Sequence, residues 1–171
     1  MVSFEDAWQF IVRVGLAAHR YGSTAGRLES FLSGLSKKFG YEGVFRSTPS
    51  DIVFAVRESP DSPQRVEFIA TPAPGVDLDK LARLGDVMQD MHAGTMSLDD
   101  SSARLDAIDK MPPPWGKLAS MLGYALVGLG LAPLLGGGWA DTISATLFSI
   151  LVYGLVLLSA RLGPVASAWL P

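Results

Sequence analysis

The sequence of 171 residues contains no cysteine and only two histidines, His19 and His92. Without cysteine the chain has no disulfides and no thiolate nucleophiles or metal ligands, which fits a reducing compartment. A zinc site needs three or four converging ligands, and neither histidine has an acidic residue four positions after it. We therefore expect no metal site and no cofactor.

Common catalytic and nucleic-acid-binding signatures are missing too. There is no Gly-x-Ser-x-Gly elbow, no Walker loop and no dinucleotide fingerprint. Lys37 and Lys38 form the only pair of adjacent basic residues, and the formal net charge is -3. These features give no reason to expect a nucleic-acid partner.

Charge is scarce near the C-terminal end, where Asp141 is the only charged residue between Lys117 and Arg161. The apolar runs at 118–135 and 142–160 are each long enough to cross a hydrocarbon core of ~30 Å as a helix of about 20 residues. A helical hairpin in a large soluble core is the alternative, but the rest of the chain is too small and too polar to enclose both helices. The sequence therefore predicts a transmembrane helical hairpin over residues 118–160, with the lipid bilayer as its partner.

The remaining charges divide the chain into regions. We predict a cytoplasmic domain over residues 1–111, a proline-rich elbow at 112–117 and a short cytoplasmic tail at 161–171. The turn between the apolar runs has no Lys or Arg, whereas Lys110, Lys117 and Arg161 flank their other ends. Positive residues favour the cytoplasmic side. Glu5 and Asp6 stand where a signal peptide carries positive charge, so we expect no cleaved export signal.

Within the first region the apolar period changes from helical to alternating and back. We expect helices from Ser3 to Arg20 and from Ser23 or Thr24 to Phe39. Strands follow near 43–48, 51–58 and 64–71, and then helices near 77–92, with Leu78 among its inward residues, and 97–108. The predicted fold class is α+β, an ααβββαα domain with a three-stranded antiparallel sheet followed by the two-helix hairpin.

Few residues suggest chemistry. The segment Ser47–Asp51 gathers hydroxyls and a carboxylate, and with His19 or Glu29 it could form a hydrolytic site, although Ser, Thr, Pro and Asp are also what a hairpin turn needs. Asp141 is a transport candidate because ionisable groups near a membrane boundary are often functional; the alternative is that it caps the second helix. Small residues at close-packing spacings are Ser120, Gly123, Gly128, Ala132, Ala145 and Ser149.

The order of several segments is informative. They are His19–Thr24 followed by Arg27–Glu29, then Phe45–Ile52 with Thr48-Pro49-Ser50, then Gly94–Leu98 leading to Leu105–Ile108, and last the proline-rich elbow before glycine-rich apolar helices. Over about residues 5–160 this order resembles the threonine/serine exporter family. The resemblance implies a protein of the bacterial inner (plasma) membrane that moves threonine or serine out of the cytoplasm, and a transporter rather than an enzyme. The positions that match the family are Gly22, Arg27, Glu29, Thr48 and Pro49.

The chain departs from that family in having only two apolar runs, because members carry more membrane helices. Two helices cannot both surround a polar path and alternate its exposure. We therefore expect a fragment, or one piece of an oligomeric assembly with other transmembrane helices or subunits. The alternative function is a membrane-tethered hydrolase-like or ligand-binding regulatory domain.

Overall fold

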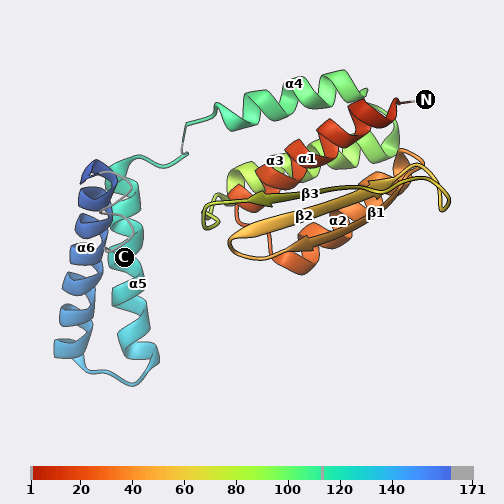
Figure 1. Ribbon diagram of the computed structural model, residues 1–171. Coiled ribbons are helices and arrows are strands. Elements are labelled where there is room, and N and C mark those ends of the chain that lie inside the picture. The colour runs from red at the N-terminus through yellow and green to blue at the C-terminus, as the bar shows by residue number, and fades with distance from the viewer. Residues whose placement is uncertain (1, 113, 163–171) are drawn as a thin grey trace. The chain divides into compact units, whose positions relative to one another are not determined.

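The computed structural model describes residues 2–112 and 114–162. The chain forms two compact units, Met1–Pro112 and Pro113–Pro171 (Figure 1). Pro113 of the predicted elbow and residues 163–171 of the predicted tail lie outside the described residues.

The first unit begins with two helices, α1 (Phe4–Arg20) and α2 (Ala25–Lys38). The Ser3 hydroxyl caps α1 by accepting a hydrogen bond from the Asp6 amide at 3.1 Å. Such a cap satisfies one of the amides that a helix N-terminus leaves unpaired. Thr24 occupies the corresponding position of α2 but makes no side-chain cap bond. The start of α2 is therefore held by packing, with Leu28 and Leu32 buried on its inner face.

The strands β1 (Glu42–Ser47), β2 (Asp51–Arg57) and β3 (Arg65–Ala70) form one antiparallel sheet in the order β1-β2-β3. The predicted three-stranded antiparallel sheet is confirmed. Phe54 of β2 is buried, and a Cβ added to Gly15 of α1 would lie 2.6 Å from its ring. Glycine at this position therefore allows α1 to pack closely on the sheet. The other face is open, with Val44, Val66 and Phe68 all at least 60% exposed.

Two further helices, α3 (Leu78–Ala93) and α4 (Leu98–Asp109), complete this unit. The buried residues of α3 are Leu84, Val87, Met88 and Met91. Leu78 was expected to face inward, but it is 67% exposed. At 3.6 residues per turn it lies roughly 240° around the helix from Leu84, outside the buried stripe.

The second unit is a pair of helices that lie side by side, α5 (Lys117–Leu134) and α6 (Trp139–Leu162) (Figure 1). Both are long and apolar enough to cross a membrane. Most of their large apolar side chains are exposed, among them Leu122, Leu126, Leu129, Ile143, Phe148 and Leu151.

The turn between these helices is shorter than the sequence predicts. We expected the second helix to begin at 142, after a turn that includes Asp141, but α6 begins at Trp139. The Asp141 carboxylate accepts a hydrogen bond from the Gly138 amide at 2.9 Å, and the Thr142 hydroxyl donates to the Gly138 carbonyl at 2.9 Å. These bonds satisfy backbone groups at the helix start, so the helix extends back beyond Asp141.

Candidate functional site

The β1–β2 turn holds the hydroxyl cluster that the sequence singles out. The Thr48 side-chain oxygen accepts hydrogen bonds from the amides of Ser50 and Asp51, each at 3.2 Å. The Thr48 amide in turn donates to the Asp51 carbonyl at 2.9 Å. A hydroxyl engaged in this way closes a tight turn. Thr48 and the exposed Pro49 beside it thus serve the geometry of the hairpin.

Glu29 of α2 reaches the same end of the sheet. Its Oε1 accepts a hydrogen bond from the Ser47 amide at 3.0 Å, and its Oε2 pairs with Arg46 at 3.4 Å. A carboxylate that accepts a backbone amide makes a strong, charge-assisted bond. The structure therefore brings Glu29 next to Thr48, where it ties α2 to the last residue of β1.

His19 of α1 is buried, and it is linked to that turn through Thr71. Its Nε2 is 2.9 Å from the Thr71 hydroxyl, and the Thr71 amide donates to the Ser50 carbonyl at 2.8 Å. A proton relay needs the base within hydrogen-bond reach of the nucleophile. In the described part of the chain the side-chain hydrogen bond of His19 goes to Thr71 and not to Ser47, Thr48 or Ser50. This geometry gives the hydrolytic alternative no support.

The other two family positions lie elsewhere. Gly22 has a φ of +95°, and a Cβ added there would lie 2.5 Å from the Gly75 carbonyl oxygen. Glycine is needed because L-residues rarely adopt positive φ and because the chain passes so close. Arg27, by contrast, is exposed and lines a cavity between α2 and α3. The structure thus groups Glu29, Thr48 and Pro49 and leaves Gly22 and Arg27 apart from them.

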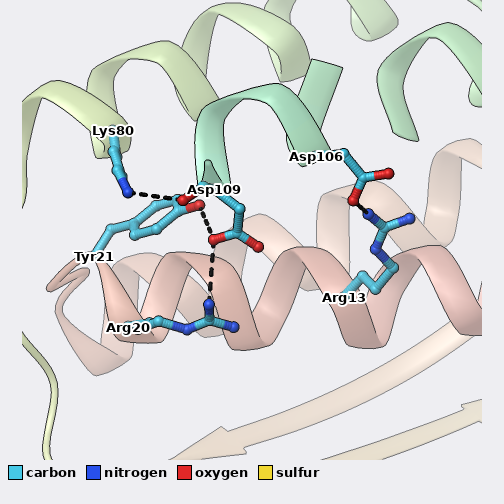
Figure 2. Close-up of polar contacts among 6 residues, drawn as sticks. All are labelled: Arg13, Arg20, Tyr21, Lys80, Asp106 and Asp109. Atoms are coloured by element: carbon cyan, nitrogen blue, oxygen red, sulfur yellow. Dashed lines mark hydrogen bonds and ion pairs between the residues drawn. The ribbon is translucent and has the colours of Figure 1, made fainter. Parts of the chain in front are cut away.

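A polar clamp between α1 and α4 is a feature that the sequence reasoning missed. Figure 2 shows the Asp109 carboxylate accepting a hydrogen bond from the Tyr21 hydroxyl at 2.6 Å and pairing with Arg20 at 3.2 Å. Lys80 of α3 donates to the Asp109 carbonyl at 3.0 Å. One helical turn earlier Asp106 pairs with Arg13 of α1. The sequence held one signal for this clamp. Two basic residues, Arg13 and Arg20, are seven apart on one helix, and two acidic residues, Asp106 and Asp109, are three apart on another.

The clamp changes the acidity of Tyr21. Burial raises the pKa of the Tyr21 hydroxyl well above its usual range, and the hydrogen bond to Asp109 and the charge of that carboxylate add to the rise. All three causes disfavour a negative charge on the Tyr21 oxygen. Tyr21 therefore stays protonated and acts as a hydrogen-bond donor that holds the end of α4.

In the second unit the helices approach closely at Gly128. A Cβ added there would lie 2.6 Å from the Ala145 carbonyl oxygen and 2.7 Å from the Ser149 hydroxyl oxygen. Gly123, another of the small residues noted in the sequence, has open space at the same position. Tyr153 donates to the Lys117 carbonyl at 3.0 Å and holds the other end of the pair. Small residues here serve contact between backbones, as in membrane helix packing.

Asp141, the transport candidate, lies in the first turn of α6 and is exposed. Its contact with the Gly138 amide makes it an N-terminal cap, and its charge is favourable at the positive end of the helix dipole. Among the residues that the structure describes, no group of three His, Asp or Glu side chains could hold a metal ion.

Comparisons with known proteins agree on a family. The family described as "Putative threonine/serine exporter" (ThrE) matches residues 9–167. A relative described as "Probable threonine/serine exporter", from Mycobacterium tuberculosis (strain ATCC 25618 / H37Rv), is 26% identical over 116 residues, which cover 68% of this chain and 22% of the relative. The chain thus spans about a fifth of the length of that relative. No solved structure matches the chain. With the match extending over both units, this chain belongs to the threonine/serine exporter family.

Proposed function

We propose that this chain contributes a cytoplasmic domain and a membrane hairpin to a bacterial threonine/serine exporter. The observation that carries the proposal is the family match over residues 9–167, which includes the α+β unit as well as both apolar helices. The proposed activity is transport, and the residues that the structure describes provide no assembled hydrolytic site that would favour an enzyme instead.

The exposure of α5 and α6 supports lipid as the solvent of the second unit. Leu126 is 66% exposed and Leu147 is 63% exposed, although such side chains belong to the most buried class in soluble proteins. The charged residues of this unit outside the masked side chains, Lys117 and Asp141, lie in the first turns of the two helices. A hydrocarbon environment would cover the exposed apolar surface and leave both charges near its boundary.

A complete transport path requires more protein than this chain. Backbone that lines a polar cavity must be shielded from lipid by other helices, and one pair of helices cannot provide that shield. The relative from Mycobacterium tuberculosis is several times longer than the aligned region. We therefore place α5 and α6 in an assembly with further transmembrane helices or a partner subunit.

The distribution of basic residues supports a cytoplasmic α+β unit. Lys110 and Lys117 stand on the approach to α5, and the α5–α6 turn has no Lys or Arg. The orientation can be tested with single cysteines, because this chain has none. A cysteine at the exposed Asp61 should react with a membrane-impermeant maleimide only after cell lysis, whereas one at the exposed Trp139 should react in intact cells. The reverse pattern would contradict the orientation.

Efflux measurements test the function itself. Cells that express the complete protein and are preloaded with labelled threonine should release the label faster than cells with an empty vector. Excess unlabelled serine inside the cell should slow this release by competition, whereas excess alanine serves as the control amino acid. Equal release with and without the protein would contradict the proposal.

The same assay separates two roles for Asp141. If Asp141 is a cap, Asp141→Asn should retain most of the efflux, because an amide oxygen can still accept the Gly138 hydrogen bond. If its charge takes part in transport, Asp141→Asn and Asp141→Ala should lose efflux equally. We propose the cap, because its carboxylate already bonds the helix start.

The other family positions in the first unit have structural roles in this proposal. Glu29 and Thr48 hold the end of β1, and Gly22 permits the close passage of Gly75. These contacts join α1, α2 and the sheet without using any ligand. Among the residues that the structure describes, Arg27 makes no contact of this kind.

A further inference from the structure

A cavity of about 520 Å³ opens between α2 and α3 in the first unit. Its walls are mostly apolar, with contributions from Phe31, Leu35, Leu81, Leu84 and Met88. Pockets that hold small organic molecules usually have volumes of roughly 300–1,000 Å³ and apolar walls with a few polar groups. The size and lining of this cavity are therefore those of a small-molecule site.

Two glycines face the same cavity. Gly34 lies within α2 and Gly85 within α3, and a Cβ added to either would meet no atom within 4 Å. Glycine destabilises a helix interior relative to alanine. Among the described residues, packing gives no reason for this choice at either position. Their shared effect is to keep the space between the two helices open.

Arg27 is the charged side chain among the residues that line the cavity. Arg27 and His92 both line the cavity and are exposed, so they belong to its open side, and no acidic residue lines it. Within the described residues the Arg27 guanidinium has no ion pair and no hydrogen bond to another side chain. A guanidinium stays charged and matches a carboxylate with two parallel hydrogen bonds. The complementary ligand carries one carboxylate on an apolar body.

We propose that this cavity binds an apolar monocarboxylate, with Arg27 paired to the carboxylate and the walls of α2 and α3 around the apolar part. Threonine and serine do not fit this description, because their side chains are short and polar and would leave most of the apolar wall uncovered. The proposed ligand therefore differs from the exported amino acid, and the site gives Arg27 a role that the other family positions do not share.

The probe that tests this inference is 4-phenylbutyrate, with the neutral 4-phenyl-1-butanol as its matched control. The full chain, labelled with 13C at the methionine methyl groups and held in lipid nanodiscs, provides the readout. The Met88 signal should shift and saturate with the acid, whereas Met111 and Met121, which do not line the cavity, should stay in place. The alcohol should bind about tenfold more weakly, because it cannot form the charge-assisted pair.

Substitutions distinguish the contribution of the Arg27 charge to binding from that of the open space in the cavity. Arg27→Gln should raise the Kd of the acid about tenfold and leave that of the alcohol unchanged, whereas Arg104→Gln, at an exposed arginine that does not line the cavity, should alter neither. Gly34→Leu should abolish the Met88 shift with both probes, because its side chain enters the open space. Amide exchange of α1 and β2 should stay slow in each variant and show that the unit remains folded.

Several results would overturn the inference. An unmoved Met88 signal, or equal affinities for acid and alcohol, would remove the carboxylate preference. Unchanged binding of the acid by Arg27→Gln would remove the role of Arg27. A saturable shift of Met88 with threonine would make the cavity a site for the exported amino acid. A shift of Met88 that follows protein concentration alone would identify a second copy of the chain as the occupant.

Discussion

The two units use the same aliphatic side chains in opposite ways. In the α+β unit Leu32 is fully buried among α1, α2 and the sheet, whereas Leu126 in α5 is 66% exposed. Water drives apolar side chains into a common core, but in hydrocarbon that drive between helices disappears and close backbone contact takes over. The difference indicates that the two units are built for two solvents.

The largest expected effect is at Leu32, the buried leucine of this comparison. Leu32→Ala should lower the free energy of unfolding of the first unit by about 2–5 kcal/mol, because it removes buried apolar atoms and leaves a cavity. Faster amide exchange in α1 and β2, measured on the full chain in nanodiscs, reports this change. The matched substitution Leu126→Ala should leave exchange in the first unit unaffected. Comparable losses from both would mean that Leu126 supports the fold of the first unit and is not covered by lipid.

A second prediction addresses the contact between α5 and α6. Gly128→Ala should separate the helices at a cost of about 1–3 kcal/mol, because the added methyl group meets backbone atoms that cannot turn away. Spin labels at positions 122 and 151, on exposed residues of the two helices, should report a longer mean distance. Gly123→Ala is the control, since its Cβ falls in open space. An unchanged distance in Gly128→Ala would mean that the pair is not held by this approach.

The smallest expected effect concerns the polar clamp of the first unit. Tyr21→Phe should lower the free energy of unfolding by about 1 kcal/mol at neutral pH through loss of the hydrogen bond to Asp109. The raised pKa of Tyr21 means that the folded chain holds the phenolic proton more tightly than the unfolded chain. Its contribution is therefore fully present below the unfolded pKa of about 10 and is lost as the pH rises above it.

Denaturant titrations of the full chain between pH 7 and pH 11 measure this dependence. The wild type should lose stability above pH 10, and Tyr21→Phe should lose less over the same range. Tyr41→Phe is a suitable control, because it removes a hydrogen bond to the Val2 carbonyl but leaves the clamp intact. An identical pH dependence in wild type and Tyr21→Phe would refute the role assigned to the clamp.

Local patterns were enough to predict the sheet and the helices of the first unit. The alternation of Ile52, Phe54 and Val56 placed β2, and Ser97 with Asp100 marked the start of α4. The position of Leu78 was misjudged because a count of apolar residues at helical spacing does not show where the buried stripe begins. The start of α6 was missed because a charged residue in an apolar segment suggested a turn, whereas Asp141 stabilises the helix start.

The candidate sites were harder to predict, because they depend on contacts between distant residues. The bond between Tyr21 and Asp109 joins positions 88 apart in the sequence, and the one between His19 and Thr71 joins positions 52 apart. Neither residue of such a pair is unusual by itself. The cavity beside Arg27 likewise results from where α2 and α3 lie in the folded unit, which the period of each helix alone does not determine.

The contacts of Asp109 have a mechanical consequence. Asp109 is the last residue of α4. The segment that leads toward α5 therefore starts from a residue that is bound by side chains of α1 and α3. A force on that segment would therefore act on α1, whose inner face forms much of the core, as well as on the last turn of α4. Any displacement of α5 and α6 that tightens the connection would thus act on the core of the first unit.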